Sequence, residues 1–237
     1  MPLDSSSYSI AQLSTQAAAD GSSYLEMGLT KIICTVHGPR ESPTRSGSSS
    51  QSPGAHIETS ISIAGFSGTD RKRHGRNDKR TQEMQHTISS AFSSTLFTHL
   101  YPHSTITISL HVLSQDGSLL AACLNAATLA LVDAGVPMSD YVVACTTGST
   151  ASYAGDGEEA DPLLDLNGLE EQELPFLTVG TSGGEDKVNV LIMETRVQVG
   201  RLEAMISVGL DGCRQIRGML DRVVREHGER VLEARVA

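Results

Sequence analysis

A short segment before residue 81 concentrates positive charge. Within ten positions it holds six cations against a single acid, Asp78: Arg71, Lys72, Arg73, Arg76, Lys79 and Arg80. Flexible cations beside the start of a helix attract phosphate groups, and the free backbone N–H groups of a first helical turn add to that attraction. No Phe, Tyr or Trp interleaves with them, so this basic segment (residues 71 to 80) favours contact with a polyanion backbone over base stacking. A solvated loop is the alternative.

A second candidate is the turn Gln115-Asp116-Gly117-Ser118, which precedes a long apolar run. A glycine at the start of a helix exposes N–H donors, so Gly117 and Ser118 are candidates to hold a phosphate. The residue that follows, Leu119, supplies no cation. Ordinary helix capping is therefore the competing interpretation.

The third candidate is an acidic tract over residues 156 to 186. It contains ten Asp and Glu residues and no Lys or Arg, and the rest of the chain balances 18 acids against 18 cations. The net charge of −10 is therefore the charge of this tract, and it does not exclude a nucleic-acid partner elsewhere on the chain. Asp165, Glu170 and Glu171 fall near a predicted strand end, where carboxylates can bind Mg²⁺ or transfer protons. Solvated acids in a loop are the alternative.

Other chemistry has little support. The chain shows no Ser-His-Asp, HExxH or Walker pattern, and its eight His residues are scattered without metal-ligand spacing. Its four Cys residues lie far apart in apolar runs, which predicts buried thiols in a reducing compartment. No apolar run reaches the ~20 residues of a membrane span, and the first residues do not form a signal peptide. We therefore expect a soluble intracellular protein that makes no membrane contact.

Hydrophobic periodicity supplies the elements that would position these candidates. An apolar stripe predicts a helix from Lys79 to Leu100, and the uniformly apolar run from Leu119 to Ala134 predicts a helix buried almost all round that ends at Gly135. The other predictions are strands at 24–27, 30–36, 56–66, 105–113, 141–147, 163–166, 176–179 and 188–193, and a last helix from 201 to 226 or beyond. This order predicts an α+β domain.

Two segments lack such periodicity. Residues 1 to 20 are rich in Ser, Ala and Gln, and we expect them to be poorly ordered. Residues 40 to 55 form a Ser-rich stretch that reads as a loop inside the domain, which we place at residues 21 to 237. Arg45 in this loop is a further candidate for contact with a polyanion.

Four segments, taken together, resemble the RNase PH family in order and spacing. They are GSSYLEMGLTKIICTVHGP (21–39), RKRHGRNDKRTQEM (71–84), ITISLHVLSQDGSLLAACLNAATLALVDAGVPMSDYV (106–142) and PLLDLNGLEEQE (162–173). The resemblance covers about residues 20 to 230. It is strongest to the eukaryotic RNA exosome ring subunit that corresponds to the archaeal catalytic subunit.

This resemblance implies an RNase PH-like fold with two βαβ-like halves, mixed sheets and packed helices. It also implies a ring of such subunits around an RNA channel, with OB-fold and KH cap proteins and a separate hydrolytic exoribonuclease as partners. The expected locations are the nucleus, the nucleolus and the cytoplasm. In phosphorolytic members, inorganic phosphate attacks the terminal linkage of RNA, and an acid, often with Mg²⁺, lies nearby.

Departures from the family pattern bear on activity. Active members carry Gly-Thr-Arg where this chain has Gly117-Ser118-Leu119, so the Arg that grips phosphate is missing. Active members also carry two Asp six residues apart, and here Asp165 matches the first whereas Glu171 replaces the second. A carboxylate displaced by about an ångström can lower a rate on the order of 100-fold. The expectation is a non-catalytic subunit with remnant acids and no cofactor.

The RNA-binding pattern is better preserved. Lys79 and Arg80 stand where the family has paired cations that contact RNA, and His103 stands where relatives can carry a further Arg. The opening motif of the family is missing before Gly21, which weakens the case for an opening strand. The alternative function is an active phosphate-dependent 3′–5′ exoribonuclease, the one case in which Mg²⁺ is expected.

Overall fold

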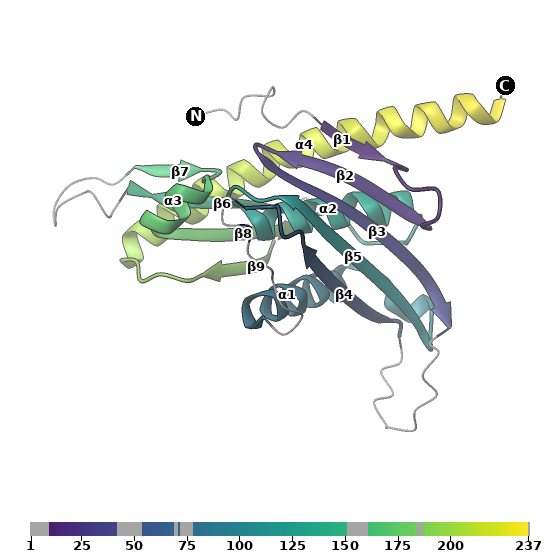
Figure 1. The fold of residues 1–237 in the computed structure, drawn as a ribbon, viewed down its shortest axis with the longest axis horizontal. Coiled ribbons are helices and arrows are strands. Elements are labelled where there is room, and N and C mark those ends of the chain that lie inside the picture. The colour runs from purple at the N-terminus through teal and green to yellow at the C-terminus, as the bar shows by residue number, and fades with distance from the viewer. Residues whose placement is uncertain are drawn as a thin grey trace.

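The computed structural model describes residues 10–41, 54–68, 71, 78–150, 161–183 and 187–236. Over these residues the chain forms two sheets with helices packed between and against them (Figure 1). This is the expected mixed fold. Arg45, Lys72, Arg73 and Arg76, which the sequence nominated for RNA contact, lie outside the described residues.

The first sheet has five strands in the order β1 (Ile10–Leu13), β2 (Gly21–Met27), β3 (Thr30–Glu41), β5 (Ser104–Ser114) and β4 (His56–Ile63). β2 and β3 form the predicted antiparallel hairpin, and Gly28 adopts a φ of 56° in its turn. β4 and β5 are parallel and are joined through α1 (Lys79–Thr95) and a short 3-10 helix (Thr98–Leu100). The alternation predicted for β5 is confirmed, because Ile106, Ile108, Leu110 and Val112 are buried.

Helix α2 (Leu119–Asp133) lies between the two sheets. Twelve of its residues are buried, as its uniform apolarity predicted, and it ends before Gly135, whose φ is 68°. On one side, the Ser23 hydroxyl of β2 donates to the Ala126 carbonyl at 2.7 Å. On the other side, the Asn125 amide donates to the Ala144 carbonyl at 2.9 Å and accepts from the Ala144 N–H at 2.8 Å. α2 therefore belongs to the core of both halves.

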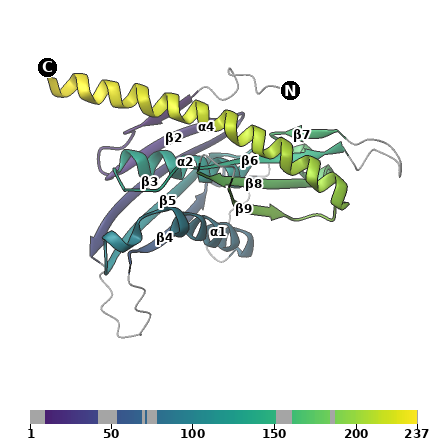
Figure 2. The same ribbon diagram turned by 180° about the vertical axis from the view of Figure 1, so that it is seen from behind.

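The second sheet is antiparallel, in the order β7 (Pro162–Leu164), β6 (Val142–Ser149), β8 (Phe176–Ser182) and β9 (Val188–Met193). The described strand pairs of the second sheet are all antiparallel, and the parallel pair β4–β5 lies in the first sheet. α4 (Val199–Val236) covers the far face of the second sheet and runs on past β1, as the view from behind shows (Figure 2). Met205, Cys213, Ile216 and Leu220 are its buried positions.

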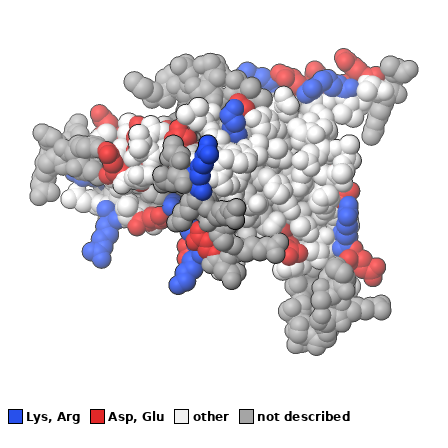
Figure 3. All heavy atoms as spheres, viewed as in Figure 1, with Lys and Arg blue, Asp and Glu red and all other residues white. Residues whose placement is uncertain are grey.

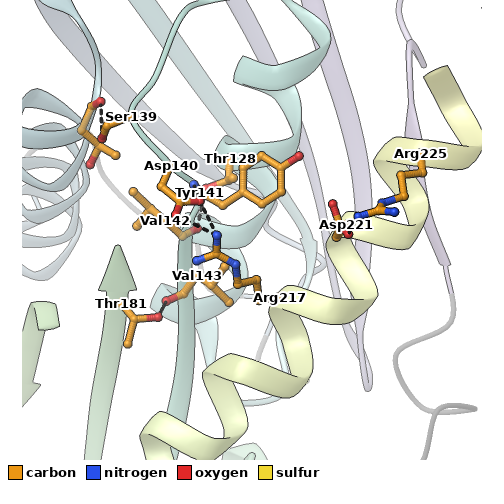
Figure 4. A network of polar contacts seen from close by, with 11 residues as sticks. Thr128, Ser139, Asp140, Tyr141, Val142, Val143, Thr181, Arg217, Asp221 and Arg225 are labelled. Carbon is orange, nitrogen blue, oxygen red and sulfur yellow. Dashed lines mark hydrogen bonds and ion pairs between the residues drawn. The ribbon is translucent and has the colours of Figure 1, made fainter. Parts of the chain in front are cut away.

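Polar contacts fix α4 at two places. Near its middle, the Arg217 guanidinium donates to both oxygens of Asp140 at 2.6 and 2.7 Å, just before β6 begins (Figure 4). Further along, His227 lies 3.4 Å from Asp133 at the end of α2. Asp133 also accepts from the Ser14 hydroxyl at 2.6 Å and from the Ser22 N–H at 2.8 Å. The start of the chain, the core helix and the last helix therefore meet at one carboxylate.

Three features differ from the sequence expectations. Part of the segment expected to be poorly ordered forms β1, which pairs with β2. Its side-chain pattern is too short to stand out, so its order depends on pairing with β2. A second feature is helix α3 (Gly168–Glu173) within the acidic tract, where a loop was considered. The third is the start of the segment expected as a Ser-rich loop (40–55): residues 40–41 belong to β3, and beyond them the structure describes only residues 54–55 of this segment.

The outward face of the first sheet carries little charge. Figure 3 shows few Lys, Arg, Asp or Glu side chains over its middle, and the charged groups lie mainly around the margins. Among the described helices, none combines the length and apolarity that crossing a bilayer requires.

Candidate functional site

The turn before α2 is held in an unusual backbone conformation. Gly117 has a φ of 79° and Ser118 a φ of 50°. Thr30 at the start of β3 fixes the turn, because its hydroxyl donates to the Gly117 carbonyl at 2.9 Å and accepts from the Asp116 N–H at 3.0 Å. A Cβ atom on Gly117 would lie 2.3 Å from the Leu166 carbonyl oxygen. Only glycine allows this close approach between the two segments.

The start of α3 packs against the turn before α2 and forms the second side of the site. Asn167 caps this helix by accepting from the backbone N–H groups of Leu169 and Glu170, and the Glu170 carboxylate accepts in return from the Asn167 N–H. This capping box explains why a helix begins inside the acidic tract. The Asp116 carboxylate also accepts from the Gly168 N–H at 3.1 Å, which ties α3 to the turn before α2.

The two remnant acids converge on Ser118. The Glu171 carboxylate accepts from the Ser118 N–H at 2.6 Å, and the Asp165 carboxylate accepts from the Ser118 hydroxyl at 2.9 Å. Asp165 itself has a φ of 57°. The acids and the Gly117-Ser118 turn, separate candidates in the sequence, therefore form one site. At its centre, the Glu171 carboxylate accepts a hydrogen bond from the backbone N–H of Ser118, the N-cap residue of α2.

Burial sets the protonation behaviour of Glu171. It raises the pKa of this carboxyl group above its usual value, because the charged form loses hydration. The hydrogen bond from Ser118 and the nearby Arg80 guanidinium lower the pKa, whereas the carboxylates of Glu194 and Asp165 raise it further. The site is thus rich in negative charge and poor in compensating cations.

Two neighbouring cavities share this site. The smaller, of about 80 Å³, is lined by Leu119 and Leu120 among others, and the larger groove of about 800 Å³ includes Gly117. Five side chains line both cavities: Arg80, Gln115, Glu171, Phe176 and Glu194. Arg80, in the first turn of α1, lies 3.7 Å from the Glu194 carboxylate. Arg80 is the one cation among the described residues of the small cavity, whereas Lys31 and Arg71 also line the large groove.

Comparison with known proteins places this arrangement in a family. Residues 9–137 match domain 1 of the 3′ exoribonuclease (RNase PH) family, and residues 140–212 match domain 2. The chain belongs to the RNase PH family. The boundary between the matched domains falls between α2 and β6, so Ser118 and the two acids that bind it come from different RNase PH domains.

Curated relatives extend over most of the chain. It is 35% identical over 214 residues to the exosome complex component SKI6 of Saccharomyces cerevisiae, covering 90% of this chain and 83% of that protein. It is 36% identical to the exosome complex component RRP41 of Homo sapiens over 219 residues, covering 92% and 85%. The RRP41 homolog of Arabidopsis thaliana is also 36% identical, over 229 residues, with 96% and 91% covered.

A solved structure agrees on the fold. The crystal structure of rice (Oryza sativa) Rrp46 superposes with a TM-score of 0.77 at 24% identity, covering 91% of this chain and 93% of that one. At this identity the likeness concerns the fold alone.

The structure separates the residues nominated for RNA contact. Arg80 and Arg71 line the large groove, and Lys79 is exposed next to Arg80. His103 is exposed beyond the other end of β5, about 40 Å along the strand from Gln115 at ~3.3 Å per residue. His103 is therefore not part of this groove.

The grouping of possible metal ligands can be compared with what a metal site needs. Among the described residues, no three His, Cys, Asp or Glu side chains are grouped as metal ligands would be. Asp165 and Glu171 each accept a hydrogen bond from Ser118, and they are the carboxylates of this site that could hold a divalent cation.

Sequence reasoning missed several residues of the site. Lys31, Phe176 and Glu194 line the groove, and none of them was proposed from the sequence as a site residue. Gln115 also lines the groove, and it belongs to the turn described from the sequence, where no role was given to it. The others come from the ends of β3, β8 and β9, so only the fold brings them to the groove.

Proposed function

We propose that this chain is a non-catalytic subunit of an RNA exosome ring that binds and threads single-stranded RNA. The relatives named above are exosome components, and the chain shares most of their length. The proposed partners are other RNase PH-like subunits, OB-fold and KH cap proteins and a hydrolytic exoribonuclease. The locations that go with this role are the nucleus, the nucleolus and the cytoplasm.

The observation that carries the non-catalytic role is the Glu171 carboxylate at the start of α2. Phosphorolysis requires a phosphate dianion beside the RNA backbone, and helix N-terminal N–H groups are suited to hold it. Here Glu171 accepts from the Ser118 N–H at 2.6 Å, so an anion already occupies this donor. The buried Leu119 follows where active family members carry Arg. A dianion at the start of α2 would therefore meet the Glu171 carboxylate, and no Arg follows Ser118 to compensate the charge.

A purified ring that contains this chain and no hydrolytic subunit tests the proposal. We expect RNA to bind and no nucleoside diphosphate to form when inorganic phosphate is added. Phosphate-dependent release of nucleoside diphosphates that Asp165→Ala abolishes would establish the alternative, an active phosphorolytic exoribonuclease.

The RNA-binding role has its own test. Arg80 lines the groove and Lys79 is exposed beside it, so the double variant Lys79→Ala/Arg80→Ala should weaken salt-dependent RNA binding by the assembled ring. Circular dichroism and unfolding curves control for folding. Unchanged RNA protection by the double variant would contradict the proposed role of these cations.

A further inference from the structure

Arg80 and Glu194 form an ion pair across the groove. Arg80 lies in the first turn of α1, and Glu194 directly follows β9, so the two side chains come from different RNase PH domains. Their closest N and O atoms are 3.7 Å apart, and their side chains are 62% and 52% exposed. Both line the small cavity and the large groove. The ion pair therefore lies where the small cavity and the large groove meet.

The small cavity has one cation for several acids. Among its described lining residues, Arg80 is the single Lys or Arg, whereas Glu83, Glu171 and Glu194 are acidic. Glu171 already accepts from Ser118, and Glu194 is paired with Arg80. A phosphate that entered would therefore need the guanidinium that Glu194 holds.

The pair is also weak enough to exchange. Exposed ion pairs contribute little because water and salt screen them, and a separation of 3.7 Å is long for a charge-assisted hydrogen bond. A phosphate group can accept two parallel N–H bonds from a guanidinium. An RNA phosphate can thus replace the Glu194 carboxylate without disturbing the buried core.

We propose that Glu194 is a displaceable latch that competes with RNA phosphate for the Arg80 guanidinium. This inference rests on the proposed RNA-binding function and adds a regulator to it. With the latch closed, Arg80 links α1 to the end of β9. With RNA bound, Arg80 turns to the phosphate and Glu194 is released to solvent. Glu194 is a positioning residue in this scheme, because it acts on RNA through Arg80.

A double-mutant cycle on RNA affinity tests the latch. The assembled ring would carry wild-type chain, Glu194→Gln, Arg80→Ala or both changes, and binding of a fluorescent single-stranded RNA would be measured at low salt. We expect Glu194→Gln to tighten binding about two- to five-fold when Arg80 is present. In the Arg80→Ala background the same change should alter affinity far less.

Glu83→Gln is the matched control, because it removes one negative charge from the same cavity. An equal gain from Glu194→Gln with and without Arg80, or an equal gain from Glu83→Gln, would show a general charge effect and overturn the latch. Absence of RNA binding by the wild-type ring would instead overturn the proposed function. A readout without RNA is the NMR signal of the Arg80 guanidinium, which must shift in Glu194→Gln if the pair exists in solution.

Discussion

Replacement of Gly117 by Ala should push the turn before α2 away from the start of α3 and destabilise the chain. The added Cβ atom would lie 2.3 Å from the Leu166 carbonyl oxygen and 2.7 Å from the Asn167 carbonyl carbon. Both neighbours are backbone atoms, which cannot rotate away as a side chain does. The turn before α2 and the start of α3 must therefore separate, and the contact between Ser118 and Glu171 must lengthen.

The magnitude follows from two effects. A non-glycine residue in the left-handed region costs about 1–2 kcal/mol, and forcing extra volume into a packed contact costs about 1–3 kcal/mol more. Gly28 separates these effects, because its φ is 56° but nothing lies within 4 Å of an added Cβ. We therefore expect the free energy of unfolding to fall by about 2–5 kcal/mol in Gly117→Ala and by about 1–2 kcal/mol in Gly28→Ala.

Urea unfolding of the two variants and the wild-type chain, followed by circular dichroism, measures this difference. Unchanged slopes against urea would show that the same surface is exposed on unfolding in all three. Equal losses of stability in Gly117→Ala and Gly28→Ala would refute the close approach of this turn and the start of α3, and with it the geometry on which the site is built.

The other predictions concern Asp133, Glu171 and the four Cys residues. Asp133→Ala should lower the free energy of unfolding by about 1–3 kcal/mol, because it removes the acceptor of the Ser22 N–H and of the Ser14 hydroxyl. Hydrogen exchange should then speed up in the last turns of α4, where His227 contacts Asp133. Unchanged exchange would show that Asp133 does not hold this end of the helix. Because burial raises the pKa of Glu171 above 4.5, its contribution to stability is greatest below that pH and is lost as pH rises through the raised pKa. Glu171→Gln should therefore gain stability relative to wild type as pH rises above 4.5 in urea titrations, and a constant difference would count against a raised pKa. The four Cys residues are buried, and burial raises the pKa of Cys123 to about 12. A maleimide should label none of them in the folded chain and all of them in urea.

Strong local patterns made much of the fold predictable. The uniform apolarity of α2 predicted a helix enclosed on all sides, and the period of two in β5 predicted its buried face. Both signals are strong because a helix packed on every side needs apolar residues throughout, whereas a strand packed on one face needs them at every second position. β1 has four residues and needs β2 as a partner, so its sequence carries no comparable trace.

The site was predictable in its parts but not in its assembly. Gly117, Ser118, Asp165 and Glu171 were each nominated, yet the bond from Ser118 to Glu171 joins residues 53 positions apart. Such a contact depends on how two domains pack, which local periodicity does not encode. The start of α3 did have a local signal, the Asn167–Glu170 capping box, which was hidden by the interpretation of the acids as a solvated loop.

The position of α2 has a consequence for how the chain can be divided. The boundary between the two family domains falls after this helix, yet the Asn125 amide of α2 binds both backbone groups of Ala144 beyond the boundary. A fragment that stops at the boundary would turn this amide and an apolar helix face to water. The two domains are therefore distinct in sequence but form one cooperative folding unit, and neither half is a natural candidate for separate expression.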